Sequence, residues 1–321
     1  MKRKLRLLFP VVAACFALSG CDFISINNAG EDGAVSGYYK KYNLKLSGPR
    51  LAQELQKMCF DKHTHWVKYG ELANYYVKTS DRNSTDAIAD GESKIQWFYT
   101  AKETTDKGTR EHVWPCANSS DLWYRDSSKV QHQVEKTSYV GGGSDLYHVR
   151  PCDGTVNSLR GNSTYVDYDD EDFKDIRDQV AEIGDGGPYK LKYTGASTNE
   201  TTGKLEFAKK TEPDDTMKGD IARIITYLWV HYTERGTTPT GGVQSGQLTY
   251  NYSDMTGGLS LTAVIGYDTL EKCQKKLKEW NEMDPPSDVE KLRNDTVQKI
   301  QGNRNPFVDY PDLVAKVFNI K

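Results

Sequence analysis

A carboxylate and an imidazole stand side by side in the first half of this chain, and an asparagine follows well downstream. Glu111 and His112 belong to the segment Arg-Glu-His-Val-Trp-Pro, and Asn157 belongs to Asp-Gly-Thr-Val-Asn-Ser. Hydrolysis of a phosphodiester needs a base for water and a hard cation that takes up charge on the leaving oxygen. A neutral histidine supplies the base, and Glu and Asn oxygens are ligands that Mg²⁺ accepts. These residue types therefore fit metal-assisted hydrolysis.

Two strands and a helix must bring these groups together. We expect Glu111-His112 to close a first strand, and a polar connection over residues 119–138 leads to a second strand over Leu146–Val149. A helix follows over Asp153–Arg160, with Asp153 well placed as its N-cap. Adjacent strand residues point to opposite faces, so Glu111 and His112 can serve one site only at a bulge or strand end.

The two blocks resemble the bacterial endonuclease I family, which are secreted or periplasmic nucleases with a ββα-metal (His-Me finger) site. Three further segments fall in the order that this family shows, namely Lys218–Arg223, Trp280-Asn281 and Gln301–Phe307. The resemblance implies a mixed α+β domain built around a ββα-metal finger, and an endonuclease that leaves 5′-phosphate ends. The segments Gly219–Arg223 and Asn303–Phe307 suggest no catalytic role, and we expect them to pack against the finger.

The resemblance also assigns roles to single residues. His112 is expected to be the general base, and Glu111 and Asn157 the protein ligands of one Mg²⁺-type ion, with Ca²⁺ or Mn²⁺ as substitutes. Asn162 is the alternative to Asn157. Arginines that grip the substrate phosphate are expected as well, since a guanidinium can hold phosphate in a bidentate manner. The candidates are Arg125, Arg150 and Arg160, whereas His148 is assigned no chemistry.

The N-terminus has the pattern of an export signal. A basic stretch precedes the apolar residues 7–18, which are too few to span a bilayer as a stop-transfer helix. The signal ends in Leu-Ser-Gly-Cys, which resembles a bacterial lipobox and predicts lipidation of Cys21. The alternative is an ordinary signal peptide with an incidental cysteine. We therefore expect a signal peptide over residues 1–20, a lipidated tether over 21–45 and one nuclease domain over 46–321, anchored to a membrane in the periplasm or at the cell surface.

Export makes the four cysteines beyond Cys21 candidates for disulfides. Three pairings are possible, and a Cys116–Cys152 bridge would link the two blocks of the finger. A zinc site of Cys116, Cys152 and His148 is the alternative, but its spacing fits no common zinc pattern. The remaining cysteines are Cys59 and Cys273.

The charge balance is unusual for a nucleic-acid binder. The formal net charge is −3, and removal of the four cationic residues of the leader leaves −7. Affinity for nucleic acid normally depends on neutralising phosphates, so we expect a local basic groove and acidic surface elsewhere. The run Asp167–Asp172 is predicted to be such a solvated acidic segment.

Helical spacing is clearest over Lys218–Tyr232, where apolar residues recur every three or four positions. Helices are also predicted from about residue 49 to 59, over 65–76, from Asp268 to Met283, from a Ser287–Glu290 capping box to Gly302, and over 313–318. Residues 94–101 are rich in aromatic and β-branched types, which is typical of a strand, and residues 184–197 and 201–208 have strand and turn character.

The predicted function is that of a membrane-tethered, low-specificity endonuclease that acts on DNA, RNA or both as a monomer. One rival is a non-catalytic surface lipoprotein that captures nucleic acid. It would need none of Glu111, His112 and Asn157. A second rival is a divalent-metal hydrolase for another phosphodiester, which fits the same residues but not the family resemblance.

Overall fold

The computed structural model describes residues 37–79, 94–118, 141–184, 186–198, 205–206, 208–233 and 259–320. Cys21 and Arg125, two of the predicted functional positions, lie outside these residues. Within the described segments, no helix is both long and apolar enough to cross a membrane.

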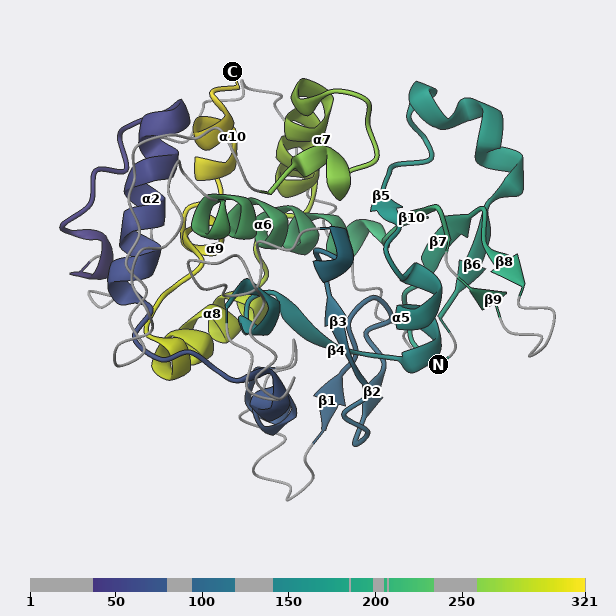
Figure 1. The fold of residues 1–321 in the computed structure, drawn as a ribbon, viewed down its shortest axis with the longest axis horizontal. Helices are drawn as coiled ribbons and strands as arrows, with labels where there is room; N and C mark the ends of the chain where they lie inside the picture. The colour runs from purple at the N-terminus through teal and green to yellow at the C-terminus, as the bar shows by residue number, and fades with distance from the viewer. Residues whose placement is uncertain are drawn as a thin grey trace, which may run out of the picture.

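A long helix, α6 (Asp215–Tyr232), runs through the middle of the molecule. Helices surround it on one side, and the strands with α5 lie on the other (Figure 1). It contacts α2, α7 and α9 directly. The remaining α-helices are α2 (Gly48–Lys62), α3 (Tyr76–Thr79), α5 (Gly154–Arg160), α7 (Leu270–Met283), α8 (Asp288–Gln301), α9 (Pro306–Asp309) and α10 (Leu313–Phe318). The 3₁₀-helices are η1 (Tyr69–Asn74), η2 (Cys116–Asn118), η5 (Gly142–Ser144), η6 (Glu171–Gln179) and η7 (Leu261–Ala263).

In the described part of the chain, the strands are short and form four small sheets. They are β1 (Ile95–Gln96), β2 (Glu103–Thr104), β3 (Thr109–His112), β4 (Val149–Cys152), β5 (Thr164–Tyr165), β6 (Ala181–Ile183), β7 (Leu191–Thr194), β8 (Ser197–Thr198), β9 (Leu205–Glu206) and β10 (Lys210–Glu212). The largest sheet has the order β5-β10-β7-β6, with β5 and β10 parallel and its other pairs antiparallel. Pairs β1-β2, β3-β4 and β8-β9 are antiparallel. The fold is therefore mixed α+β, as predicted.

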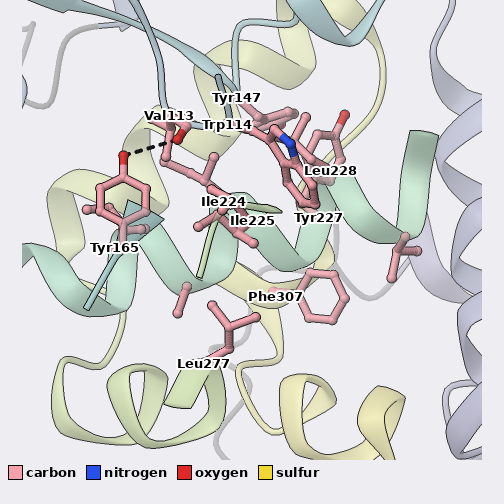
Figure 2. Close-up of a cluster of buried hydrophobic side chains, with 14 of the residues drawn as sticks. Val113, Trp114, Tyr147, Tyr165, Ile224, Ile225, Tyr227, Leu228, Leu277 and Phe307 are labelled. Atoms are coloured by element: carbon pink, nitrogen blue, oxygen red, sulfur yellow. Dashed lines mark hydrogen bonds between the residues drawn. The ribbon is translucent and has the colours of Figure 1, made fainter. Parts of the chain in front are cut away.

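The core joins α6 to the segment that follows Glu111 and His112. Figure 2 shows side chains of α6 packed with residues that follow β3, precede β4 or belong to β5, and with residues of α7 and α9, and the labelled residues are buried. The Tyr165 hydroxyl donates a hydrogen bond of 3.1 Å to the Val113 carbonyl. Burial of each large apolar side chain stabilises the fold by about 1.5–3 kcal/mol, so this cluster fixes the end of β3. Its labelled members are Val113, Trp114, Tyr147, Tyr165, Ile224, Ile225, Tyr227, Leu228, Leu277 and Phe307.

The observed caps confirm some of the predicted helix ends and correct others. Asp214 accepts from the Thr216 amide at 3.1 Å and starts α6 one turn before the predicted residue 218. The Ser287 hydroxyl accepts from the Glu290 amide at 3.1 Å, and Gly302 ends α8 with φ of 91°. The cap of α7 is Thr269 rather than Asp268. The helix predicted over residues 65–76 is replaced by η1 and α3.

Two predicted strands differ from those observed. The strand expected over residues 94–101 is limited to β1, because Tyr99 and Ala101 adopt left-handed φ angles of 67° and 51° in the turn to β2. The second strand of the finger begins at Val149 rather than at residue 146. The Asp145 carbonyl accepts hydrogen bonds from the amides of His148 and Val149, which turns the chain before β4 begins.

The acidic run Asp167–Asp172 is only partly the solvated segment that we expected. Asp169, Glu171 and Asp172 are exposed, whereas Asp167 is buried. Asp167 lies 3.2 Å from the ammonium of Lys218 on α6, and Asp170 lies 2.8 Å from that of Lys276 on α7. The ion pairs were not predicted, because a local run of acids gives no sign of the lysines that distant helices bring to it.

Candidate active site

Strands β3 and β4 form an antiparallel hairpin, and α5 follows β4 and packs against β3. Glu111 lies opposite Arg150 and His112 opposite Val149. Asp153 caps α5 by accepting from the amides of Thr155 and Val156, as predicted. The hairpin and helix therefore bring the Glu-His block and the Asn157 block into contact. Neighbouring strand residues alternate in direction, so Glu111 is buried, whereas His112 is partly exposed.

The His112 ring is oriented by a backbone carbonyl. Its Nε2 atom lies 2.9 Å from the oxygen of Gly143 in η5. A carbonyl oxygen can only accept, so Nε2 carries the proton and Nδ1 keeps the lone pair. The ring of Tyr69 stacks on His112, with centroids 5.8 Å apart and planes 12° apart. His112 thus has the tautomer and partial exposure that a general base requires.

His148 lies behind His112 and fastens the hairpin. Its Nδ1 donates to the Gly142 carbonyl at 2.7 Å, and its Nε2 accepts from the Trp114 amide at 3.0 Å. The ring touches the His112 ring edge-on at 5.3 Å. Burial, together with the positive charge that His112 can carry, lowers the pKa of His148 to about 3. His148 is therefore neutral, and its hydrogen bonds connect the backbone on either side of the hairpin.

The Glu111 carboxylate is turned into the protein, with only 1% of the residue exposed. It accepts a hydrogen bond of 2.7 Å from the Tyr99 hydroxyl and lies 3.5 Å from Nε of Arg160. Burial raises the pKa of Glu111 to about 7, although Arg160 and Tyr99 act in the opposite direction. The negative charge of the Glu111 carboxylate is thus only partly compensated, and a bound cation would stabilise this charged form.

Asn157 lies on the side of α5 that faces β3. Its Nδ2 donates to the Thr109 hydroxyl at 2.8 Å and to the Arg110 carbonyl at 3.3 Å. This orientation leaves Oδ1 as the atom suited to a cation. Arg160, one helical turn later, is the α5 residue that reaches Glu111. Asn162, the alternative ligand, is exposed beyond the helix end, where its carbonyl accepts from Asn118.

A hard divalent cation fits these residues by their donor chemistry. Glu111 and Asn157 offer oxygen atoms, which are the ligands that Mg²⁺, Ca²⁺ and Mn²⁺ prefer. Both residues contact the interface between α5 and β3. The partly compensated charge on the buried Glu111 is the feature of the structure that favours an ion there.

Two of the three arginines predicted to bind substrate are interior residues. Arg150 is 2% exposed and lies over the Phe98 ring at 5.0 Å. Arg160 is 1% exposed and donates to the carbonyls of His112 and Val113, at 3.3 Å and 2.6 Å. In this structure Arg160 therefore joins α5 to the end of β3. The third candidate, Arg125, lies outside the described residues.

The C-terminal segment Gln301–Phe307 contacts the turn that precedes β4. Gln301 accepts from the Leu146 amide at 2.7 Å and donates to the Asp145 carboxylate at 3.1 Å. The amide of Asn303 donates to the Tyr227 hydroxyl at 2.7 Å, and that hydroxyl donates to Asp145 at 2.6 Å. This buried network fixes the turn before β4. The expected packing of this segment against the finger is confirmed.

A different set of metal-type groups lies deeper in the protein. His63, Asp145 and His231 are buried, and their ligand atoms lie within 4.8 Å of one another. Imidazole nitrogens suit zinc-type ions rather than Mg²⁺. The Asp145 carboxylate already accepts four hydrogen bonds, including those from Tyr147 and Tyr232. The Nδ1 atom of His63 lies 3.2 Å from Nε2 of His231, so these two ring nitrogens are within hydrogen-bond distance of each other.

The four cysteines of the described residues are free thiols, so the predicted disulfides are not formed. Cys152 is buried in β4, and Cys116 lies in η2 after the first block. Burial raises the thiol pKa of both residues, which lowers their reactivity. The alternative zinc site of these two with His148 is also not formed among the described residues, since Nδ1 and Nε2 of His148 are bonded to the backbone.

One partly exposed position beside His112 was not among the predicted site residues. Arg110 lies two residues before His112 on β3, so the two side chains share one side of the strand. Its guanidinium lies over the Tyr69 ring. The two-residue spacing from His112 in a predicted strand is the signal that could have identified it.

Comparison with known proteins places this geometry in a family. The model of the Endonuclease I family matches residues 47–312. The chain is 30% identical over 270 residues to an extracellular ribonuclease of Bacillus amyloliquefaciens, a match that covers 77% of this chain and 79% of the relative. It is also 30% identical over 197 residues to an extracellular ribonuclease of Bacillus subtilis, covering 61% of this chain and only 54% of that protein. A protein named Endonuclease-1 from Buchnera aphidicola is 25% identical over 203 residues, covering 62% of this chain and 60% of that protein.

Proposed function

We propose that this chain, which belongs to the Endonuclease I family, is an exported nuclease that hydrolyses phosphodiester bonds of DNA, RNA or both. The observation that carries the proposal is the orientation of His112. Its Nε2 is held by the Gly143 carbonyl, which leaves Nδ1 as the basic nitrogen of a partly exposed ring. In this role Nδ1 accepts a proton from a water molecule as that water attacks phosphorus.

The structure gives the imidazole what this step needs. His148 is held neutral by burial, so it adds no positive charge that would oppose protonation of His112. The Gly142-Gly143 backbone that orients His112 is itself fixed by His148. The protonated imidazole therefore forms without rearrangement of the hairpin, which is the meaning of a preorganised base.

Glu111 and Asn157 would hold one Mg²⁺-type ion, for which Ca²⁺ or Mn²⁺ can substitute. When bound, the ion supplies positive charge that neutralises the phosphate and the leaving oxygen. Arg160 and Tyr99 position the Glu111 carboxylate, and Thr109 with the Arg110 carbonyl positions the Asn157 amide.

Low sequence specificity and export complete the proposal. The proposed groups act on phosphate and water, and contacts to phosphate carry no direct sequence information. Two relatives are named extracellular ribonucleases, which supports RNA as a substrate and a site of action outside the cytoplasm, and a third is named Endonuclease-1, which supports cleavage within the strand. Lipidation of Cys21 would then tether the enzyme to a membrane of the cell envelope.

The test is to incubate the chain from residue 22 to 321 with supercoiled plasmid and with structured RNA, with Mg²⁺ and with EDTA. We expect metal-dependent cleavage that disappears in His112→Ala. Folded protein that retards plasmid on a gel but cuts neither substrate would instead indicate a nucleic-acid-capturing lipoprotein. Turnover of a small chromogenic phosphodiester without cleavage of plasmid or RNA would indicate another phosphodiesterase.

A further inference from the structure

We propose that Arg110 forms a phosphate-binding subsite beside His112, in which the Tyr69 ring positions the guanidinium for a phosphate of the nucleic-acid strand. This inference rests on the proposed nuclease function and adds to it a residue that contacts substrate.

The strand geometry places Arg110 on the same side as the candidate base. Side chains in a strand alternate between its two faces, so residues two apart point the same way. In β3 the buried residue is Glu111, while Arg110 and His112 on either side of it are partly exposed. The Arg110 carbonyl is also held by the amide of Asn157. Arg110 is therefore fixed between the base and a candidate metal ligand.

A single aromatic ring contacts both Arg110 and His112. The Arg110 guanidinium carbon lies 4.8 Å from the centroid of the Tyr69 ring, within the range of a cation–π contact. The same ring stacks on His112 with nearly parallel planes. Tyr69 begins η1, a segment far from β3 in sequence. This arrangement sets the distance between the guanidinium and the imidazole, as a subsite for a phosphate near the scissile bond requires.

The charge of Arg110 is not neutralised by a carboxylate of the described part of the chain. Its Nε atom is buried there without a hydrogen-bond partner. Other arginines of the protein are treated differently, since Arg223 pairs with Glu290 at 2.6 Å and Arg304 pairs with Asp309 at 2.6 Å. In a protein of net negative charge, an uncompensated guanidinium next to the candidate base is suited to a phosphate, which it can hold with two parallel hydrogen bonds.

The kinetic test compares the full chain with Arg110→Gln and Arg110→Lys, using plasmid and RNA substrates. Hydrogen bonds to charged groups contribute about 1.5–3 kcal/mol, so we expect Arg110→Gln to lower kcat/KM by about 10- to 100-fold. Arg110→Lys should recover part of the loss, because it keeps the charge but not the planar fork. Lys102→Gln is the matched control, since Lys102 also lies over an aromatic ring, that of Trp97. It should cleave like the parent.

The salt dependence of binding separates a phosphate contact from a structural role. In the His112→Ala background, the slope of log Kd against log salt for duplex DNA should shrink by about 0.9 when Arg110→Gln removes one phosphate contact. Arg110→Lys should retain the parent slope. A folded Arg110→Gln variant, with the parent Tm, that keeps both the parent slope and the parent kcat/KM would overturn the inference while the nuclease function stands. Absence of cleavage by the unmutated chain would instead overturn the proposed function, and the slope measurement would still report on Arg110.

Discussion

The molecule contains two close pairs of histidines that differ in how their ring nitrogens are used. In the pair His112 and His148, one ring is partly exposed and held at Nε2 by a carbonyl, and the other is bonded to the backbone at both nitrogens. In the pair His63 and His231, both rings are buried and 3.2 Å apart. There His63 Nε2 and His231 Nδ1 have no hydrogen-bond partner in the described structure.

The difference shows what a reactive histidine needs beyond its residue type. Burial strongly lowers the pKa of His63, His148 and His231, so these three rings resist protonation. His112 is the ring of the four that is partly exposed, and its tautomer is set by the Gly143 carbonyl. The proposed base thus combines one accessible imidazole with a buried neutral imidazole, His148, that contacts it edge-on, whereas His63 and His231 form a buried core contact.

The largest effect that follows from this contrast is the loss of activity in His112→Ala. General-base catalysis contributes about 10²- to 10⁴-fold, and we expect kcat to fall by that factor. The free energy of unfolding should change little, because the ring is partly exposed. His65→Ala, which removes an exposed histidine, is the control and should keep full activity. A His112→Ala enzyme that retains most of its kcat would show that another group acts as the base.

The second effect concerns stability rather than chemistry. His148→Ala leaves the Trp114 N–H and the Gly142 carbonyl without partners in a buried place. Each of the two unsatisfied groups costs about 1–3 kcal/mol, so chemical denaturation should show a loss of about 2–6 kcal/mol. His148→Asn, which keeps a donor and an acceptor, should lose less. If His148→Ala were as stable as the parent, His148 would not stabilise the hairpin through these hydrogen bonds.

The sequence predicted much of the site because its local signals are strong. Asp153 caps the finger helix, and the apolar stripe after residue 218 forms the central helix, as the residue types indicate. The Glu-His and Asn157 blocks are brought into contact by β3 and α5 as expected. Periodicity alone does not connect the Glu-His block with the Asn157 block. The resemblance to a known family predicted that the two blocks lie together.

The remaining features depend on contacts that local patterns do not contain. A position at the end of a helix suggests that Arg160 lies on the surface. It is buried instead, because Glu111 and the carbonyl of Val113 after β3 contact its guanidinium. The acidic run near Asp167 is tied down by lysines from α6 and α7. The even number of cysteines suggested disulfides, but thiol spacing does not fix distances in space, and the thiols remain free.

A third prediction sharpens the contrast at Glu111. The folded pKa of Glu111 is raised to about 7 from a usual value of 4.5, chiefly by burial. The stability contributed by the protonated form is fully present below pH 4.5 and is lost as pH rises through 7. Glu111→Gln has no carboxyl group that titrates, so it does not lose this stability as pH rises. The difference in free energy of unfolding, variant minus parent, should therefore increase by about 2–3 kcal/mol between pH 4.5 and pH 8.

Metal provides the second arm of that experiment. If Glu111 binds the ion, Mg²⁺ at pH 8 should raise the Tm of the parent and leave that of Glu111→Gln unchanged. Asp106→Asn, in the exposed turn between β2 and β3, is a matched control for loss of a carboxylate. An equal response of all three proteins to Mg²⁺ would exclude Glu111 as a ligand.

The smallest expected effect is a change in the pH dependence of stability at the buried pair His63 and His231. Burial lowers the pKa of His63 to about 4 from its usual 6.5. A depressed histidine pKa contributes stability that is present above pH 6.5 and is lost as pH falls toward 4, since the unfolded chain then binds more protons. His63→Phe keeps an aromatic ring against Trp66, which stacks on His63 at 3.7 Å, but has no proton to bind. Its unfolding free energy should therefore fall less than that of the parent between pH 7 and pH 5, by about 1–2 kcal/mol. The contribution of His231 is common to both proteins. Parallel pH profiles for the two proteins would mean that the pKa of His63 is the same in the folded and unfolded chains, and the two histidine pairs would then differ less than their burial indicates.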